Sequence, residues 1–259
     1  MGVSFFFILS GFSLSMGYGK RINDINIKTF LRKRLIKIYP MHLLTLAYRV
    51  ITFLLIPLFL GEEVCKKVIA LVLNLFLLQA WIPDGDLIFS YNTIAWFLSP
   101  IVFFYLVFPF LYKIIDRVKL QYLLTVLMVT YVLAALNVPR SMIQEILYVS
   151  PLFRMFDFCI GIASFKLLMM IQTKGLNVKN YLKVEKYIPY VFEMVSILLV
   201  LTTIAIHPIC DARWNTAALY WIPMSATILL LSLSETQVGG VFCRNQSSSG
   251  VEPQVTRCI

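Results

Sequence analysis

The sequence predicts an all-α membrane protein, folded as a polytopic bundle of transmembrane helices. Of its 259 residues, 59% are hydrophobic and 14% are charged, whereas soluble proteins average about 45–50% and about 25%. Long uncharged runs recur along the chain, and each approaches the roughly 20 residues that a membrane span requires. The runs are continuously apolar and do not alternate as in a transmembrane β-barrel, so we expect the spanning elements to be helices.

Hydropathy along the chain predicts about seven or eight membrane segments. No Pro- or Ser-rich linker separates them, so we expect residues 1–233 to form one transmembrane domain. Residues 234–259 are polar and aperiodic, and we expect a disordered tail there. The expected segments are 3–18, 40–60, 68–82, 93–115, 120–138, 152–171, 187–206 and 216–233.

The net charge of +10 is explained by loops that set the orientation in the membrane, without a nucleic-acid partner. Seven Lys and Arg residues lie between Lys20 and Lys37, and such loops are typically cytoplasmic. The basic segments 113–119 and 174–186 favour the same side. The loops 83–92 and 207–215 hold one basic residue between them, so we expect them on the outside.

These assignments conflict with strict alternation, because three expected segments separate the first two cytoplasmic loops. Two explanations are open. Either the short segment 68–82 dips into the membrane and returns, or the loop 113–119 does not follow the charge rule. The five cysteines are scattered without a C-x-x-C pair, so neither a disulfide framework nor a metal site is expected.

The run 30-FLRKRLIKIYPMHLL-44 is the first candidate binding element. Arg34 and Lys37 are three residues apart and share one helix face. Two fixed cations at a membrane surface can hold phosphate, and arginine can grip two oxygens at once. The alternative is that they contact lipid headgroups and set topology. His42, further along the run, is a weak candidate for a general base, or an interfacial histidine whose hydrogen bonds are satisfied.

Polar residues inside expected spans give further candidates for a site. Trp96, Ser99 and Tyr105 lie among aliphatic residues, and Pro100 is expected to break the helix beside them. A broken helix at membrane depth is tolerated where it lines a cavity, so these three residues are candidate cavity-lining residues. Asp157 is a fourth, although Arg154 is three residues away and can pair with it along a helix.

Four stretches in fixed order resemble one family. They are 2-GVSFFFILSGFSLS-15, 30-FLRKRLIKIYPMHLL-44, 94-IAWFLSPIVFFYLVFPFL-111 and 151-PLFRMFDFCIGI-162. Together they resemble the acyltransferase-3 family of integral membrane O-acyltransferases. The resemblance implies a bundle of about ten transmembrane helices in the cytoplasmic membrane. It also implies transfer of an acyl group, usually acetyl from acetyl-CoA, to a hydroxyl of a cell-surface or exported saccharide, with no tightly bound cofactor.

The R-x-x-R motif of that family, which serves the acyl donor, falls on Arg34 and Lys37. Lysine keeps the charge of the second arginine but loses its bidentate geometry. The family's catalytic histidine lies in a helix upstream of Met1, so we expect a sequence truncated at both ends relative to the family. The alternatives to an acyltransferase are a polysaccharide–lipid flippase, a small-molecule transporter, or a membrane remnant without activity.

Overall fold

The structure is a computed structural model that describes residues 2–55, 64–173, 188–211, 214 and 218–233. Every regular element in these ranges is a helix, which confirms the expected all-α class. The expected tail 234–259 and the basic segment 174–186 lie outside the described residues.

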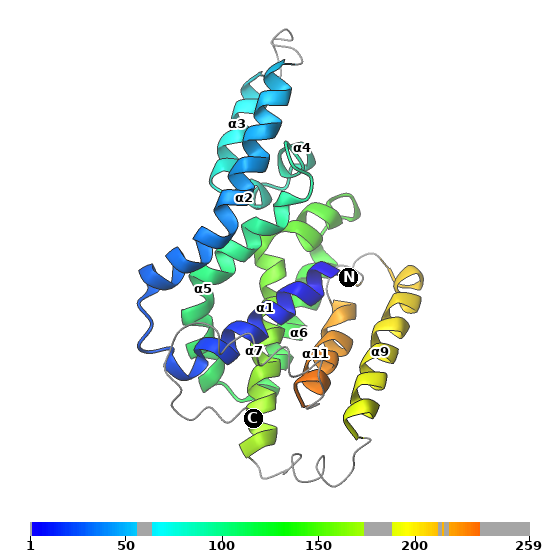
Figure 1. Ribbon diagram of the computed structural model, residues 1–259. Coiled ribbons are helices and arrows are strands. Elements are labelled where there is room, and N and C mark those ends of the chain that lie inside the picture. Colours follow the sequence, from blue (N-terminus) through cyan, green and yellow to red (C-terminus); the bar gives the residue numbers. More distant parts are fainter. Residues whose placement is uncertain (1, 56–63, 174–187, 212–213, 215–217, 234–259) are drawn as a thin grey trace.

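The centre of the bundle is the crossing of α1 (Gly2–Tyr18) and α7 (Pro151–Thr173), which lie across each other in Figure 1. Gly11 and Gly161 allow this close crossing. A Cβ atom on Gly11 would lie 2.2 Å from the Phe158 carbonyl oxygen, and one on Gly161 would lie 2.0 Å from that of Ile8. Small residues at such crossings let two helix backbones approach closely, which is how membrane helices commonly associate.

Three further helices pack against this crossing, and a fourth packs against one of them. Three helical stretches of the described residues are long and apolar enough to span a membrane: Ala95–Arg117, Leu120–Asn137 and Tyr190–Ile209. A fourth candidate is the pair Arg140–Val149 and Pro151–Ile171, which is bent by 49°. Two shorter apolar helices, α1 and α11, add to the bundle. The helices against the crossing are α5 (Leu98–Arg117), α6 (Leu120–Asn137) and α11 (Ala218–Leu233), and α9 (Ile188–Ile206) packs on α11.

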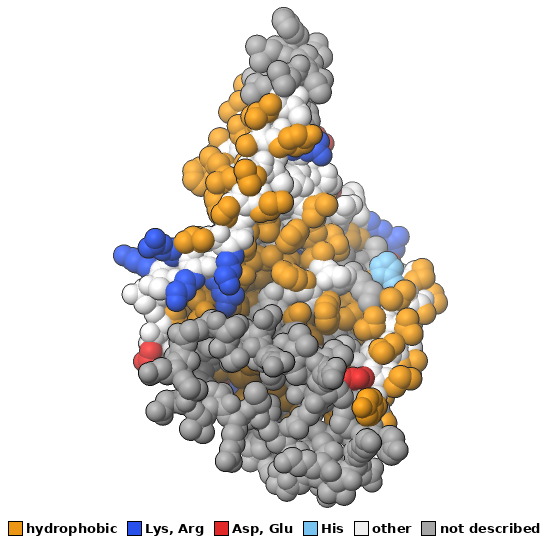
Figure 2. All heavy atoms as spheres, in the orientation of Figure 1, with side chains coloured by type: hydrophobic (Ala, Val, Ile, Leu, Met, Phe, Trp, Pro, Cys, Tyr) orange, Lys and Arg blue, Asp and Glu red, His pale blue; other side chains and the backbone are white. Residues whose placement is uncertain are grey.

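The helices α2 (Ile27–Leu55) and α3 (Val64–Leu75) run side by side and project from the bundle (Figure 1). We call this pair the α2–α3 arm. Figure 2 shows hydrophobic side chains along the arm and over α9, with Lys and Arg side chains gathered over the first part of α2. Such uncovered apolar surface suits a lipid environment.

The expected segment 68–82 is not one helix. The helix α3 has 12 residues and is about 18 Å long, which is shorter than the roughly 30 Å of a bilayer core. The chain then turns at Leu77, which has a positive φ of 56°. Three short elements follow: η2 (Gln79–Trp81), α4 (Gly85–Ile88) and η3 (Ala95–Phe97).

The loop after α1 and the end of α5 lie at the same end of the bundle. A Cβ atom on Gly19 would lie 2.4 Å from the Tyr112 hydroxyl oxygen, and Lys113 and Arg117 line a cavity together with Asn23. The two basic segments are therefore neighbours in space. This favours the first of the two explanations for the charge conflict: the segment 68–82 turns back, and the loop 113–119 follows the charge rule.

Candidate functional site

Arg34, on α2, lies among three aromatic rings, which we call the aromatic frame. Its guanidinium carbon is 5.4 Å from the ring centroid of Tyr18 and 5.8 Å from those of Phe30 and Tyr105. The rings come from α1, α2 and α5, so three helices fix one side chain. Cation–π contacts at this range attract a guanidinium to ring faces, and they consume none of its N–H donors.

The donors of Arg34 remain available. Within the described residues its guanidinium has no hydrogen bond and no ion pair. Lys37, one turn further along α2, is exposed, and it too is without a hydrogen bond or ion pair to the described part of the chain. Arg32 and Lys33 are also exposed. The structure therefore distinguishes Arg34, which is half-buried and held by the aromatic frame, from the three cations around it.

An open cavity of about 200 Å³ lies near the aromatic frame, between the loop after α1 and the last turn of α5. We call it the basic cavity, because Lys113 and Arg117 are among its lining residues. The full lining is Gly19, Ile22, Asn23, Tyr112, Lys113, Asp116 and Arg117.

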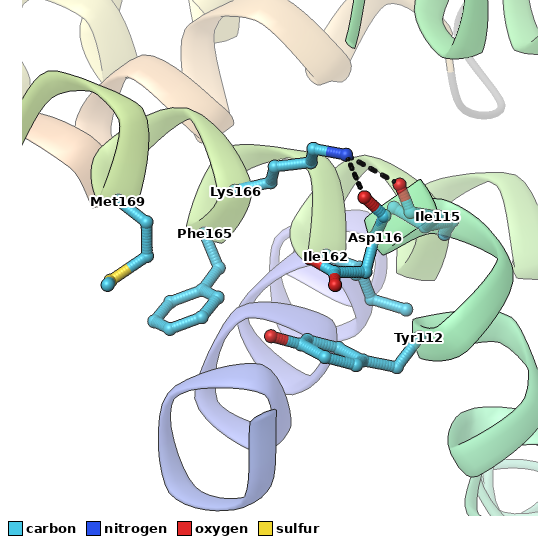
Figure 3. Close-up of a pocket in the computed structure, with 7 residues that line it drawn as sticks. All are labelled: Tyr112, Ile115, Asp116, Ile162, Phe165, Lys166 and Met169. Carbon is cyan, nitrogen blue, oxygen red and sulfur yellow. Dashed lines mark hydrogen bonds between the residues drawn. The ribbon is translucent and has the colours of Figure 1, made fainter. Parts of the chain in front are cut away.

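A smaller cavity of about 50 Å³ adjoins the same end of α5, and Figure 3 shows its lining. Here Lys166 of α7 reaches the C-terminal end of α5. Its Nζ donates to the carbonyl oxygens of Ile115, Asp116 and Val118 at 2.8, 2.7 and 2.6 Å. These are carbonyls that a helix end leaves without a partner, so Lys166 caps α5 from another helix.

A buried ion pair lies near the start of α1, away from the aromatic frame at its end. Arg154 donates to Asp157 at 2.8 Å, and both side chains are 0% exposed. Arg154 also donates to the Ser4 hydroxyl at 2.9 Å, and the Trp221 indole N–H donates to Asp157 at 2.6 Å. Hydrogen bonds with Ser4 of α1 and Trp221 of α11 thus offset part of the cost of burying the pair.

Residues 1–244 match the family described as an acyltransferase domain. The chain belongs to the acyltransferase-3 family. It is also 38% identical over 123 residues to the acyltransferase MdmB of Streptomyces mycarofaciens. That match covers 47% of this chain and 30% of MdmB, so the chain matches less than a third of the length of this curated relative. No solved structure matches the chain.

In this member of the acyltransferase-3 family, Trp96 and Ser99 are buried. The Trp96 ring packs on Tyr148, with centroids 5.2 Å apart, and the Ser99 hydroxyl has no hydrogen-bond partner among the described residues. The break expected at Pro100 takes the form of a helix start, because α5 begins at Leu98 directly after η3. Proline is tolerated in a first turn, where its missing N–H would have no partner anyway. A cavity lined by these residues stays a prediction.

His42 lies in the α2–α3 arm, apart from the aromatic frame. It is eight residues from Arg34 on α2, which corresponds to about 12 Å along the helix axis. Its Nε2 is 2.9 Å from the Asn74 carbonyl oxygen, and only an N–H can pair with a carbonyl. Tyr39 donates to the neighbouring Leu75 carbonyl. Both side chains thus cap the end of α3, which favours the structural interpretation of His42.

Asp157 is brought together with Arg154, as the three-residue spacing predicts. Its position is fully buried, and it is not among the residues that line the two cavities described here. No sequence signal points to Ser4 or Trp221, because their partners Arg154 and Asp157 are distant along the chain. The same holds for Lys166, whose partners at the end of α5 are about 50 residues away and whose charge is the only sequence signal.

Proposed function

We propose that the protein is a multi-pass acyltransferase of the cytoplasmic membrane. It would move an acyl group, acetyl in the simplest case, from acyl-CoA to a hydroxyl of a cell-surface or exported saccharide. Family membership supports acyl transfer in general. The observation that carries the choice of donor is the half-buried Arg34, whose guanidinium is held by three rings and keeps its donors for a ligand.

Transfer of the acyl group needs no reagent other than acyl-CoA and the acceptor hydroxyl. The acceptor oxygen attacks the thioester carbonyl carbon, the carbon–sulfur bond breaks, and CoA leaves as a thiolate that is then protonated. A base takes the proton from the acceptor hydroxyl. Within this chain His42 is a weak candidate for that base, because its Nε2 already donates to the Asn74 carbonyl oxygen.

Arg34 would hold a phosphate of CoA and so place the thioester. A guanidinium can donate two parallel hydrogen bonds to one phosphate. The aromatic frame fixes the side chain before the ligand arrives, which lowers the entropy lost on binding. Lys37, exposed one turn away, would add a point charge with no fixed geometry.

Membranes containing the protein can be tested with radiolabelled acetyl-CoA, with bound label and label in saccharide counted separately. The Arg34→Ala, Lys37→Ala double variant should weaken binding of acetyl-CoA by about tenfold or more, since charge-assisted bonds are the strong ones. Arg34→Lys should fall between this variant and the wild type. Lys33→Ala removes a neighbouring exposed charge and should bind normally. Equal binding by the double variant and the wild type would refute the donor role of Arg34.

A further inference from the structure

We infer that the basic cavity is a second anion site, which binds a phosphate of the nucleotide half of CoA. The inference rests on the proposed function for the identity of the donor. It adds Lys113, Arg117 and Asn23 as binding residues, separate from Arg34. The chemistry recognised is a phosphate ester, which the membrane can also supply as a lipid headgroup.

The donors in the basic cavity come from two elements, α5 and the loop after α1. Lys113 and Arg117 are four residues apart, so they lie one turn apart on the same face of α5. Asn23 faces them from the loop after α1. Within the described residues, none of these three side chains has a hydrogen bond or an ion pair. Two cations and an amide are therefore free to donate to an anion in the cavity.

Two negative groups oppose an anion there, and one of them is neutralised. The C-terminus of a helix carries about half a negative charge, and the basic cavity lies at the C-terminus of α5. Lys166 places a full positive charge on that end. It donates to the carbonyls of Ile115 and Asp116 (Figure 3) and to that of Val118, the residue after the helix. The other negative group is the Asp116 carboxylate in the lining, which two cations outweigh.

The position of the cavity favours CoA over a lipid headgroup. Tyr18 belongs to the aromatic frame, and the next residue, Gly19, lines the basic cavity. Tyr105 of the frame and Tyr112 of the cavity are seven residues apart on α5, which is about 10 Å along its axis. CoA carries a diphosphate and a separate 3′-phosphate on one nucleotide, so it can occupy two anion sites. A diacyl lipid with one phosphate occupies only one.

Gly19 permits the close packing that shapes the cavity. A Cβ atom at this position would lie 2.4 Å from the Tyr112 hydroxyl oxygen and 2.7 Å from the ring carbon that carries it. Any other residue would therefore push the tyrosine ring or the loop away. The cavity thus depends on a close approach between α1 and α5 that this glycine permits.

The test is binding of CoA, 3′-dephospho-CoA and pantetheine to the full 259-residue chain in detergent micelles. A Lys113→Gln, Arg117→Gln double variant should bind CoA about tenfold or more weakly, with binding of pantetheine unchanged. Asp116→Asn should bind CoA more tightly, a change that general damage to the fold would not produce. Lys119→Gln removes a nearby charge that does not line the cavity, and it is the matched control.

The outcomes separate the two proposals. A wild type that binds no CoA would refute the proposed function and this inference together. A wild type that binds CoA no better than the Lys113→Gln, Arg117→Gln variant would refute this inference alone. Binding of lipid is measured in parallel, with nanodiscs that contain or lack phosphatidylglycerol. If the double variant loses bound phosphatidylglycerol but keeps its affinity for CoA, the cavity is a headgroup site and the inference is wrong.

Discussion

The Gly161→Ala substitution tests how the bundle is held together at the crossing of α1 and α7. Intrinsic helix propensity favours alanine over glycine by up to about 1 kcal/mol, so propensity alone predicts stabilisation. The added Cβ would lie 2.0 Å from the Ile8 carbonyl oxygen and 2.9 Å from the Phe12 nitrogen. Both contacts are backbone atoms of α1, which no side-chain rotation can move away.

The two helices must therefore separate by roughly 1.4 Å to reach ordinary contact, and overpacking of this kind costs about 1–3 kcal/mol or more. The steric term exceeds the gain in propensity. For a chain of this size, each kcal/mol corresponds to about 2–4 °C in Tm, so we expect Tm to fall by several degrees. Gly11→Ala should behave alike, because its Cβ would lie 2.2 Å from the Phe158 carbonyl oxygen.

The assay is thermal unfolding of the purified protein in detergent, followed by intrinsic fluorescence. Gly85→Ala is the matched control, since its nearest contact is the Glu145 carboxylate at 3.7 Å, and its Tm should be close to that of the wild type. A Gly161→Ala protein as stable as the wild type, or more stable, would refute the close crossing of α1 and α7.

Three further predictions concern single side chains. Asp157→Asn leaves a buried arginine without its counter-charge and should cost about 3–5 kcal/mol, measured as a lower Tm, whereas Asp86→Asn, in an exposed ion pair, should leave Tm unchanged. His42→Phe removes the hydrogen bond between α2 and α3 and should speed proteolysis of the arm; equal digestion rates would contradict this. The Lys66 ammonium lowers the pKa of Asp86 below its ordinary 3.8, chiefly through a hydrogen bond. This contact is therefore present above pH 3.8 and lost as the pH falls through the lowered value, and a carbon-13 NMR titration should show a higher midpoint in Lys66→Met.

The sequence predicts the parts of this fold that depend on local composition. The three helical stretches long enough to span a membrane closely match the expected segments 93–115, 120–138 and 187–206, because a continuous apolar run in lipid has few alternatives to a helix. The sequence does not predict where α3 ends, because no local composition marks the turn that follows it. The chain turns there at Leu77, with a φ of 56°, and leucine gives no signal for a conformation that usually requires glycine.

The same distinction holds for the candidate site. Spacing along a helix predicts that Asp157 pairs with Arg154, and it places Arg34 and Lys37 on one face. Spacing does not show which of these two cations is half-buried among aromatic rings and which is exposed. That depends on Tyr18 and Tyr105, which reach Arg34 only through the packing of three helices. Sequence periodicity describes one helix at a time, whereas the aromatic frame is a property of their assembly.

The helix α1 joins two clusters that are otherwise far apart. Ser4 near its start is bonded to Arg154, and Tyr18 at its end stacks on Arg34. The two residues are about 21 Å apart along the axis, and the crossing at Gly11 holds the rod between them. Both clusters therefore depend on the position of one helix. A substitution that shifts α1 at the crossing, such as Gly11→Ala, is expected to disturb the hydrogen bond at Ser4 and the packing of Tyr18 on Arg34 together.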